Sequence, residues 1–149
     1  MKKIVIKGLS TLLDTPIIYN KFDISIIMED EDLLNEVISN SKLDDYIFAR
    51  SGSNNIVGGG GVHFASSLGN KKMLEILLDK YAVVNILDDQ GNSPIDYALK
   101  RPIIVEILLN AGADIKVKKT NGKSVVCKAK ELDLVDTLKT FNKHGYFCS

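Results

Sequence analysis

Two stretches of the sequence repeat the same pattern of residues, and this internal repeat constrains the fold more than any other feature. The first stretch runs from Gly61 to Asn85 and the second from Pro94 to Lys116. Each has a short apolar segment and then a longer one rich in Leu and Ile. Self-similarity at a period of about thirty residues is typical of proteins built from stacked repeat units, so we expect such a stack.

Helix and turn signals divide the repeats in the same way. Gly58, Gly91 and Gly122 recur near this period beside polar residues, which indicates a turn, the tip of a projecting loop, before each unit. Ser93 is suited to cap a short helix that starts with Pro94, where the missing N–H of proline costs nothing. Gly112 is suited to end the longer helix that follows, because glycine adopts a left-handed conformation readily.

The repeat also sets the expected domain organisation, which is a single domain over residues 1–149. We place the repeats at 55–87, 88–118 and 119–149. The last one is the most charged, which suits a C-terminal cap whose outer face no neighbour covers. Residues 1–54 match poorly, so we expect a degenerate, mostly helical N-terminal cap or repeat with an insertion at Asp44–Asn54. The tail from His144 to Ser149 is expected to be frayed or loosely packed.

The composition argues against several classes of partner. Of the 149 residues, 45% are hydrophobic and 26% are charged, which is typical of a soluble globular protein. The 19 basic and 19 acidic residues cancel, so the chain has no overall attraction for nucleic acid. No apolar run approaches the length of a membrane span, and we expect no membrane partner. We expect a monomer in the cytoplasm.

Cys127 and Cys148 are the two cysteines, and they lie far apart without the spacing of metal ligands. We therefore expect free thiols in a reducing compartment, with neither a disulfide nor a metal site. A catalytic pair of one cysteine and one histidine is a less favoured alternative.

Two glycine-containing segments resemble phosphate-binding loops. Gly58–Gly61 would expose backbone N–H groups, but no Lys-Ser or Lys-Thr follows it. Gly122-Lys123-Ser124 resembles the end of a P-loop, but Val117 stands where that loop needs another glycine. We interpret both as turns of the repeat and the first as a flexible finger, and we expect no cofactor.

The two stretches resemble the ankyrin repeat, whose pattern has a Thr-Pro-Leu-His segment, a Leu-rich second helix and a Gly-Ala-Asp ending. The matches in the second stretch are Asp88, Gly91, Ser93, Pro94, Ile95, Ala98, Ile107, Leu108, Leu109, Gly112, Ala113, Asp114 and Ile115. The matches in the first are Gly58, His63, Ala65, Gly69, Leu77, Leu78, Ala82, Val84 and Asn85. The resemblance covers about residues 55–141.

This resemblance implies an all-α fold, an ankyrin repeat solenoid of stacked helix-turn-helix units with projecting loop fingers. It also implies that His63 holds its turn by hydrogen bonds. The chain departs from the pattern at Gly60–Gly61, where Thr-Pro usually stands, and at Asp96 and Cys127, which replace the histidine.

The resemblance implies binding without catalysis. We interpret the chain as a protein–protein interaction module that binds a host or cellular protein through its concave face. Its richness in Ile, Asn and Lys resembles short poxvirus-type ankyrin proteins, which would make it a viral host-interaction factor in the host cytoplasm. The alternative is a truncated remnant of a larger ankyrin and F-box-like ubiquitin-ligase adaptor with little activity of its own.

Candidate binding residues are expected at the loop tips and on the inner face of the short helices, which line one concave groove in this architecture. Tyr97 and Arg101 lead because Tyr and Arg are enriched at interface hot spots. The alternative, that Tyr97 packs between repeats and Arg101 is only solvated, stays open. The candidates are Val57, Gly59, Phe64, Ser67, Asp89, Gln90, Asn92, Tyr97, Lys100, Arg101, Asn121 and Lys123, with Lys128 beside the last.

Overall fold

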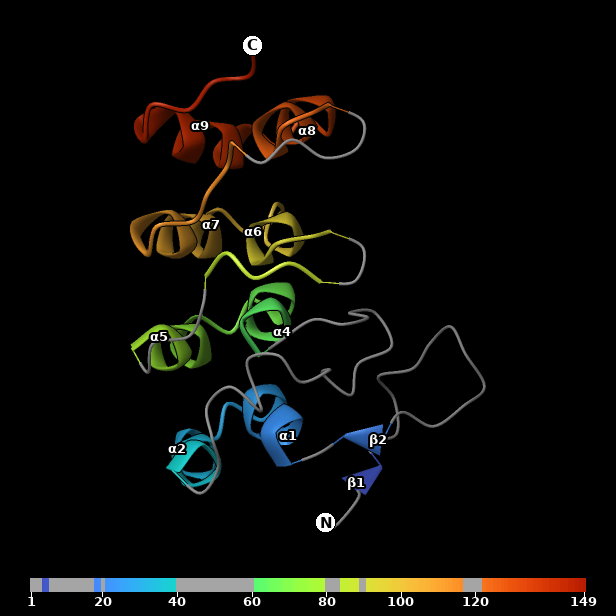
Figure 1. The fold of residues 1–149 in the computed structure, drawn as a ribbon, viewed down its shortest axis with the longest axis vertical. Helices are drawn as coiled ribbons and strands as arrows, with labels where there is room; N and C mark the ends of the chain where they lie inside the picture. Colours follow the sequence, from blue (N-terminus) through green and yellow to red (C-terminus); the bar gives the residue numbers. More distant parts are fainter. Residues whose placement is uncertain are drawn as a thin grey trace.

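Pairs of antiparallel helices stack on one another along the longest axis of the molecule (Figure 1). The computed structural model describes residues 4–5, 18–19, 21–39, 61–79, 84–88, 91–116 and 122–149. The helix pairs are α1 (Lys21–Ile27) and α2 (Glu31–Ser39), α4 (Gly61–Leu68) and α5 (Lys71–Asp79), α6 (Pro94–Tyr97) and α7 (Pro102–Asn110), and α8 (Val125–Glu131) and α9 (Val135–Lys143). This architecture confirms the predicted all-α fold class.

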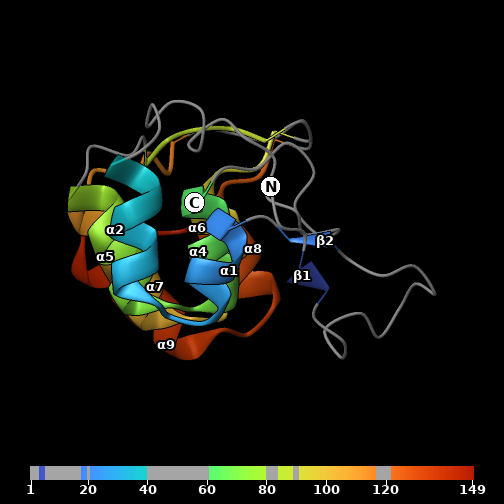
Figure 2. The ribbon, with the colours of Figure 1, turned by 90° about the horizontal axis from the view of Figure 1, so that it is seen from below.

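The helices form two layers. The first helices of the pairs, α1, α4, α6 and α8, lie in one column and the second helices lie in the other, and Figure 2 looks along this stack. Two short strands, β1 (Ile4–Val5) and β2 (Ile18–Tyr19), pair antiparallel beside α1. The sequence analysis did not predict this strand pair. Its predicted insertion at Asp44–Asn54 lies outside the described residues.

Local signals in the sequence place the ends of the helices in the second half of the chain. Ser93 precedes α6, and its N–H and hydroxyl donate to the Asp96 carboxylate at 2.9 and 3.1 Å. Gly112 follows α7 with a φ of 92°, which allows the Ala113 N–H to donate back to the Leu108 carbonyl at 2.9 Å. The predicted cap at Ser93 and terminator at Gly112 are therefore confirmed.

One continuous apolar core runs through the four helix pairs of the described residues, from Ile26 in α1 to Phe141 in α9. Both layers of helices contribute to it, α4 with Val62, Phe64 and Ala65 and α5 with Met73, Leu74 and Leu77. Leu74 in α5, together with Val105 and Leu108 in α7, has no exposed surface. Burying such a side chain stabilises the fold by roughly 1.5–3 kcal/mol relative to leaving it in water, so adjacent units stabilise one another.

Polar contacts also join neighbouring pairs. The buried Thr137 hydroxyl in α9 donates to the Leu99 carbonyl at 2.6 Å, which ties the last pair to the turn between α6 and α7. On the surface, Lys143 in α9 forms a salt bridge of 2.9 Å with Glu106 in α7. The hydroxyl bond is the more important link for stability, because exposed ion pairs contribute little.

The C-terminal segment corrects two expectations. Cys127 and Cys148 are not free thiols, since they form a disulfide across a sequence separation of 21. The tail is not loosely packed either, because Tyr146 and Cys148 both contact the core. The cause is Gly145, whose φ of 81° turns the chain back so that the Tyr146 N–H donates to Phe141 at 3.0 Å. This turn brings Cys148 to the first turn of α8.

Candidate functional site

A network of hydrogen bonds holds the base of the loop that precedes α6. Asp88 is only 6% exposed, and its Oδ1 accepts a 2.8 Å bond from the Asn92 backbone N–H. The Tyr97 hydroxyl donates to the other oxygen of Asp88. The Asn92 carbonyl in turn accepts from Nε2 of His63 in α4 at 2.9 Å, so that nitrogen carries the proton. The network therefore fastens the loop to the preceding unit.

Burial sets the protonation of this network. It lowers the pKa of His63, and the hydrogen bond to Asn92 opposes this shift only in part. Burial and the bond to Asp88 raise the pKa of Tyr97 to about 12. The edge of one ring also faces the other, with centroids 5.7 Å apart. His63 therefore holds its turn by a hydrogen bond, as the resemblance implied.

A groove of about 460 Å³ is lined by residues in or just after the short helices α4, α6 and α8. Its volume falls within the range of roughly 300–1,000 Å³ found for ligand pockets. Five residues named as binding candidates from the sequence line it. They are Ser67, Tyr97, Lys100, Arg101 and Lys128.

The groove carries positive charge. Lys100 and Arg101 follow α6, Lys128 lies on α8, and all three are exposed. Among the salt bridges of the described residues, none involves any of these three cations. The Asp96 carboxylate on the groove wall accepts hydrogen bonds from Ser93. The three cations are therefore available to a bound molecule.

Arg101 lies directly over Gly69, the glycine that ends α4. A Cβ atom added to Gly69 would lie 2.6 Å from Nη1 and 2.9 Å from Cζ of Arg101. Because Gly69 has no side chain, the end of the Arg101 side chain can occupy the space beside it. Arg101 is consequently more than a solvated residue, since the preceding unit positions it at the groove.

Tyr97 combines the two roles that the sequence left open. Its hydroxyl binds Asp88 at the base of the loop, and its ring is packed edge-on against His63 between two units. The same residue lines the groove and is only partly buried. A substitution at Tyr97 would therefore change both stability and the groove.

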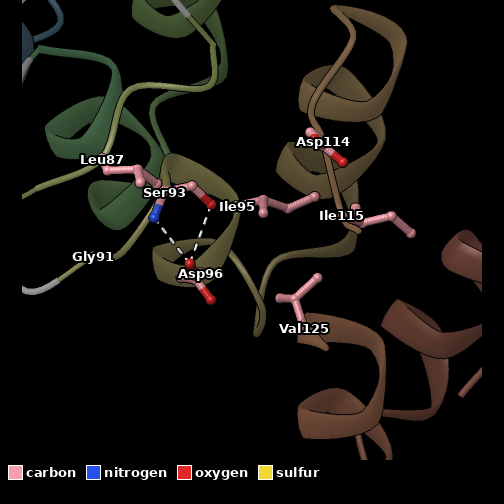
Figure 3. A pocket seen from close by; sticks show the side chains of 8 residues that line it. All are labelled: Leu87, Gly91, Ser93, Ile95, Asp96, Asp114, Ile115 and Val125. Carbon is pink, nitrogen blue, oxygen red and sulfur yellow. Dashed lines mark hydrogen bonds between the residues drawn. The ribbon is translucent and has the colours of Figure 1, made fainter. Parts of the chain in front are cut away.

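A second, much smaller cavity of about 20 Å³ lies between α6, the segment after α7 and α8. Figure 3 shows Ile95 and Val125 extending into the space between these elements, with Asp96 bonded to Ser93 at its side. That volume is close to the space of one water molecule. The cavity is a packing gap between units and has no room for a ligand.

The remaining candidates divide into three groups. Phe64 was wrongly placed on the surface: it is 3% exposed and belongs to the core, because the first six residues of α4 are all buried. Asn92 lies in the hydrogen-bonded base of the loop, and Lys123 forms a salt bridge with Glu131 at the end of α8. Val57, Gly59, Asp89, Gln90 and Asn121 lie outside the described residues.

Three residues of the groove were missed by the sequence analysis: Asp96, Leu99 and Leu132. Leu99 and Leu132 follow the short helices α6 and α8, where the chain turns toward the long ones. The equivalent place of these two leucines after successive short helices was the available signal. Leu132 is 49% exposed, so it adds apolar surface to the rim of the groove.

The described residues bear on the other classes of site as well. Cys127 and Cys148 are both consumed by the disulfide, so neither offers a thiolate to pair with a histidine. In the ranges that the structure describes, no three His, Cys, Asp or Glu side chains gather as metal ligands would. Within the same part of the chain, no helix has the length and apolar character to cross a membrane.

Known proteins share this repeat. A family model described as ankyrin repeats, in three copies, matches residues 29–119, which is more than half of the chain. A protein of Caenorhabditis elegans, the ANK repeat-containing protein nipk-1, is 33% identical over 109 residues. That match covers 60% of this chain and 18% of the nematode protein, so the chain spans a small part of its relative.

Proposed function

The chain belongs to the ankyrin repeat family, whose members are protein–protein interaction modules, and we propose that it binds its partner in the groove beside α4, α6 and α8. The observation that carries this proposal is the gathering of Tyr97, Arg101 and Lys128 from two successive units around one groove. Aromatic and arginine side chains are enriched at interface hot spots.

The proposed module is non-catalytic. The buried His63 donates its Nε2 proton to a backbone carbonyl, and burial lowers its pKa, so it is committed to the fold. The two sulfur atoms are joined to each other. Around the groove are three cations, apolar surface, hydroxyl groups and one carboxylate, Asp96, which Ser93 ties to the start of α6, and this set suits recognition of a partner better than bond cleavage.

We also propose that the partner is a cellular protein of a host and that the chain acts there as a cytoplasmic monomer. The support for this proposal is the amino-acid composition, which is rich in Ile, Asn and Lys, together with the residues at the ends of the repeats. Sedimentation of the purified protein tests the monomer. The identity of the captured partner tests the host origin.

The experiment that tests the binding face compares two triple variants in partner capture from extracts of the natural host cell. The first replaces Lys100, Arg101 and Lys128 with serine. The second, a matched control of the same charge change, replaces Lys71, Lys130 and Lys139, which are exposed and do not line the groove.

We expect the first variant to lose a partner that the wild-type protein and the control variant both retain. Circular dichroism should be the same for all three proteins. A partner held equally by both variants would place binding on another face.

A further inference from the structure

The groove has a chemistry that selects among protein partners. Resting on the proposed function, we propose that it binds an acidic linear segment of the partner, in which carboxylates flank at least one large apolar side chain. The carboxylates would pair with Lys100, Arg101 and Lys128. The apolar side chain would pack against Leu132 and the ring of Tyr97.

Charge is the first argument for this occupant. The chain as a whole has a formal net charge of zero, with 19 basic and 19 acidic residues. Three cations gathered at one groove are therefore a local feature of this surface. Some exposed basic residues elsewhere, such as Lys123 and Lys143, are paired with Glu131 and Glu106.

The available hydrogen bonds are the second argument. Asp96 also lines the groove, but its Oδ1 is buried and its Oδ2 accepts two hydrogen bonds from Ser93, which ties that acid to the start of α6. It therefore does not form a salt bridge with the groove cations among the described residues. An incoming carboxylate would meet donors that no acid of the described ranges engages in a salt bridge.

The exposed apolar rim is the third argument. Leu132 is 49% exposed at the turn between α8 and α9, while its neighbour in the groove, Leu99, is 4% exposed and belongs to the core. An apolar side chain placed over Leu132 would remove this surface from water. A purely polyanionic ligand, such as a phosphate-rich strand, would leave it exposed, so the groove fits mixed acidic and apolar character better.

Preorganisation of Arg101 is the fourth argument. Its side chain crosses the backbone of Gly69, where even a Cβ atom would come within 2.6 Å of Nη1. A side chain at position 69 would exclude the Arg101 guanidinium from this place beside the groove, where it can form a bidentate pair with a carboxylate. Gly69 is therefore a positioning residue for the groove as well as the end of α4.

Fluorescence anisotropy with short synthetic peptides tests the proposal on the full chain. The probe peptide places leucine between glutamates. Its comparison peptides carry lysine for glutamate, serine for leucine, or phosphoserine for glutamate. We expect the probe to bind at micromolar to millimolar concentration and more weakly as salt is added, because salt screens exposed charges.

Single charge reversals then locate the binding. Lys128→Glu and Arg101→Glu are each expected to lower the affinity for the probe peptide by about tenfold, since each removes one attraction and adds one repulsion. Lys130→Glu is the matched control, because Lys130 is also an exposed residue of α8 but does not line the groove. It should change the affinity by less than about twofold.

A second pair of variants tests the positioning of Arg101 without removing its charge. Gly69→Ala pushes the arginine aside, whereas Gly112→Ala has the same kind of backbone strain and nothing within 4 Å of the new atom. Both variants should lose stability, because alanine disfavours the φ values of 75° and 92° at these positions. Only Gly69→Ala is expected to lower the affinity for the probe peptide, by roughly threefold.

The outcomes separate this inference from the proposed function. Probe binding that is lost in Lys128→Glu and kept in Lys130→Glu supports the acidic segment. No binding up to about 1 mM, equal binding by all variants, or preference for the phosphoserine or the serine peptide overturns it. The proposed function would survive that result if the serine triple variant still lost its natural partner.

Discussion

The third residue of a short helix has different chemistry in two regions of this molecule. In α4 it is His63, which donates a hydrogen bond to the Asn92 carbonyl in the loop that follows its unit. In α8 it is Cys127, which is covalently bonded to Cys148 in the segment that follows its unit. Both residues link a short helix to the next extended segment.

The comparison teaches that the backbone turn after a long helix is the same in two units, whereas the side-chain contact that joins a short helix to the next segment differs. The chain turns at Gly112 after α7 and at Gly145 after α9 with the same pair of backbone hydrogen bonds, to Leu108 and Leu109 in one case and to Phe141 and Asn142 in the other. A hydrogen bond links α4 to the loop that follows its unit, and the burial of His63 shields this bond from water. The disulfide links α8 to the segment that follows α9.

Breaking the covalent link should have the largest effect on stability. Replacing Cys127 and Cys148 together with serine removes a constraint on a loop with a sequence separation of 21. The chain-entropy estimate for a loop of that length is about 3 kcal/mol of unfolding free energy. Urea unfolding followed by circular dichroism measures this loss.

Reduction of the wild-type protein provides the control for that prediction. With dithiothreitol present, the wild-type and the double variant should unfold at similar urea concentrations. Identical midpoints for the oxidised and reduced wild-type protein would contradict a structural role for the disulfide.

Breaking the hydrogen-bonded link should have the next largest effect. His63→Ala removes a side chain with no exposed surface and leaves the Asn92 carbonyl with one donor fewer. The expected loss is about 2 kcal/mol, from the cavity and the lost bond together. His144→Ala is the comparison, since His144 is partly exposed at the end of α9 and should cost less.

A smaller effect is expected where α9 contacts the turn before α7. Thr137→Val keeps the shape of the buried side chain but removes its 2.6 Å hydrogen bond to Leu99, at a cost of about 1 kcal/mol. Thr140→Val makes the same change one turn later, where the hydroxyl donates within the helix to Asp136. Equal unfolding midpoints for the two variants would show that the Thr137 bond does not stabilise the joint.

The smallest expected effect is a pH dependence of stability, to which the hydrogen-bonded His63 contributes and the disulfide does not. Because burial lowers the pKa of His63, the unfolded chain binds a proton more readily than the folded one. Stability is therefore fully present above about pH 6.5 and declines as the pH falls through that value toward the lowered pKa.

The variant His63→Gln tests this sign, because an amide can still donate to Asn92 but does not titrate. Urea midpoints measured at neutral and mildly acidic pH should fall less for the variant than for the wild-type protein. A wild-type midpoint that rises on acidification would contradict the argument.

The sequence predicted the features that local chemistry determines. Ser93 and Gly112 are helix-end signals that act within a few residues, and the structure confirms both. The role of His63 was implied by the resemblance to the ankyrin repeat, and its hydrogen bond to Asn92 bears it out. The stacking of all-α units followed as well, because every unit carries the apolar residues that its neighbours cover.

The misses concern contacts between distant parts of the chain. Phe64 was placed on the surface because the short helices were expected to expose one face, whereas α4 buries its first six residues. The disulfide depends on the turn at Gly145, which brings Cys148 back to α8. The contact of Arg101 with Gly69 likewise joins two units, and no periodicity within one unit predicts it.

Site-specific photo-crosslinking tests the central claim, that a protein partner occupies the groove beside the short helices. Ser67 lines the groove, and Glu75 is exposed on α5 in the other layer, so each can carry a benzoylphenylalanine in place of its own side chain. The account predicts crosslinks to a partner from position 67 and none from position 75. Crosslinks from position 75 alone would contradict it.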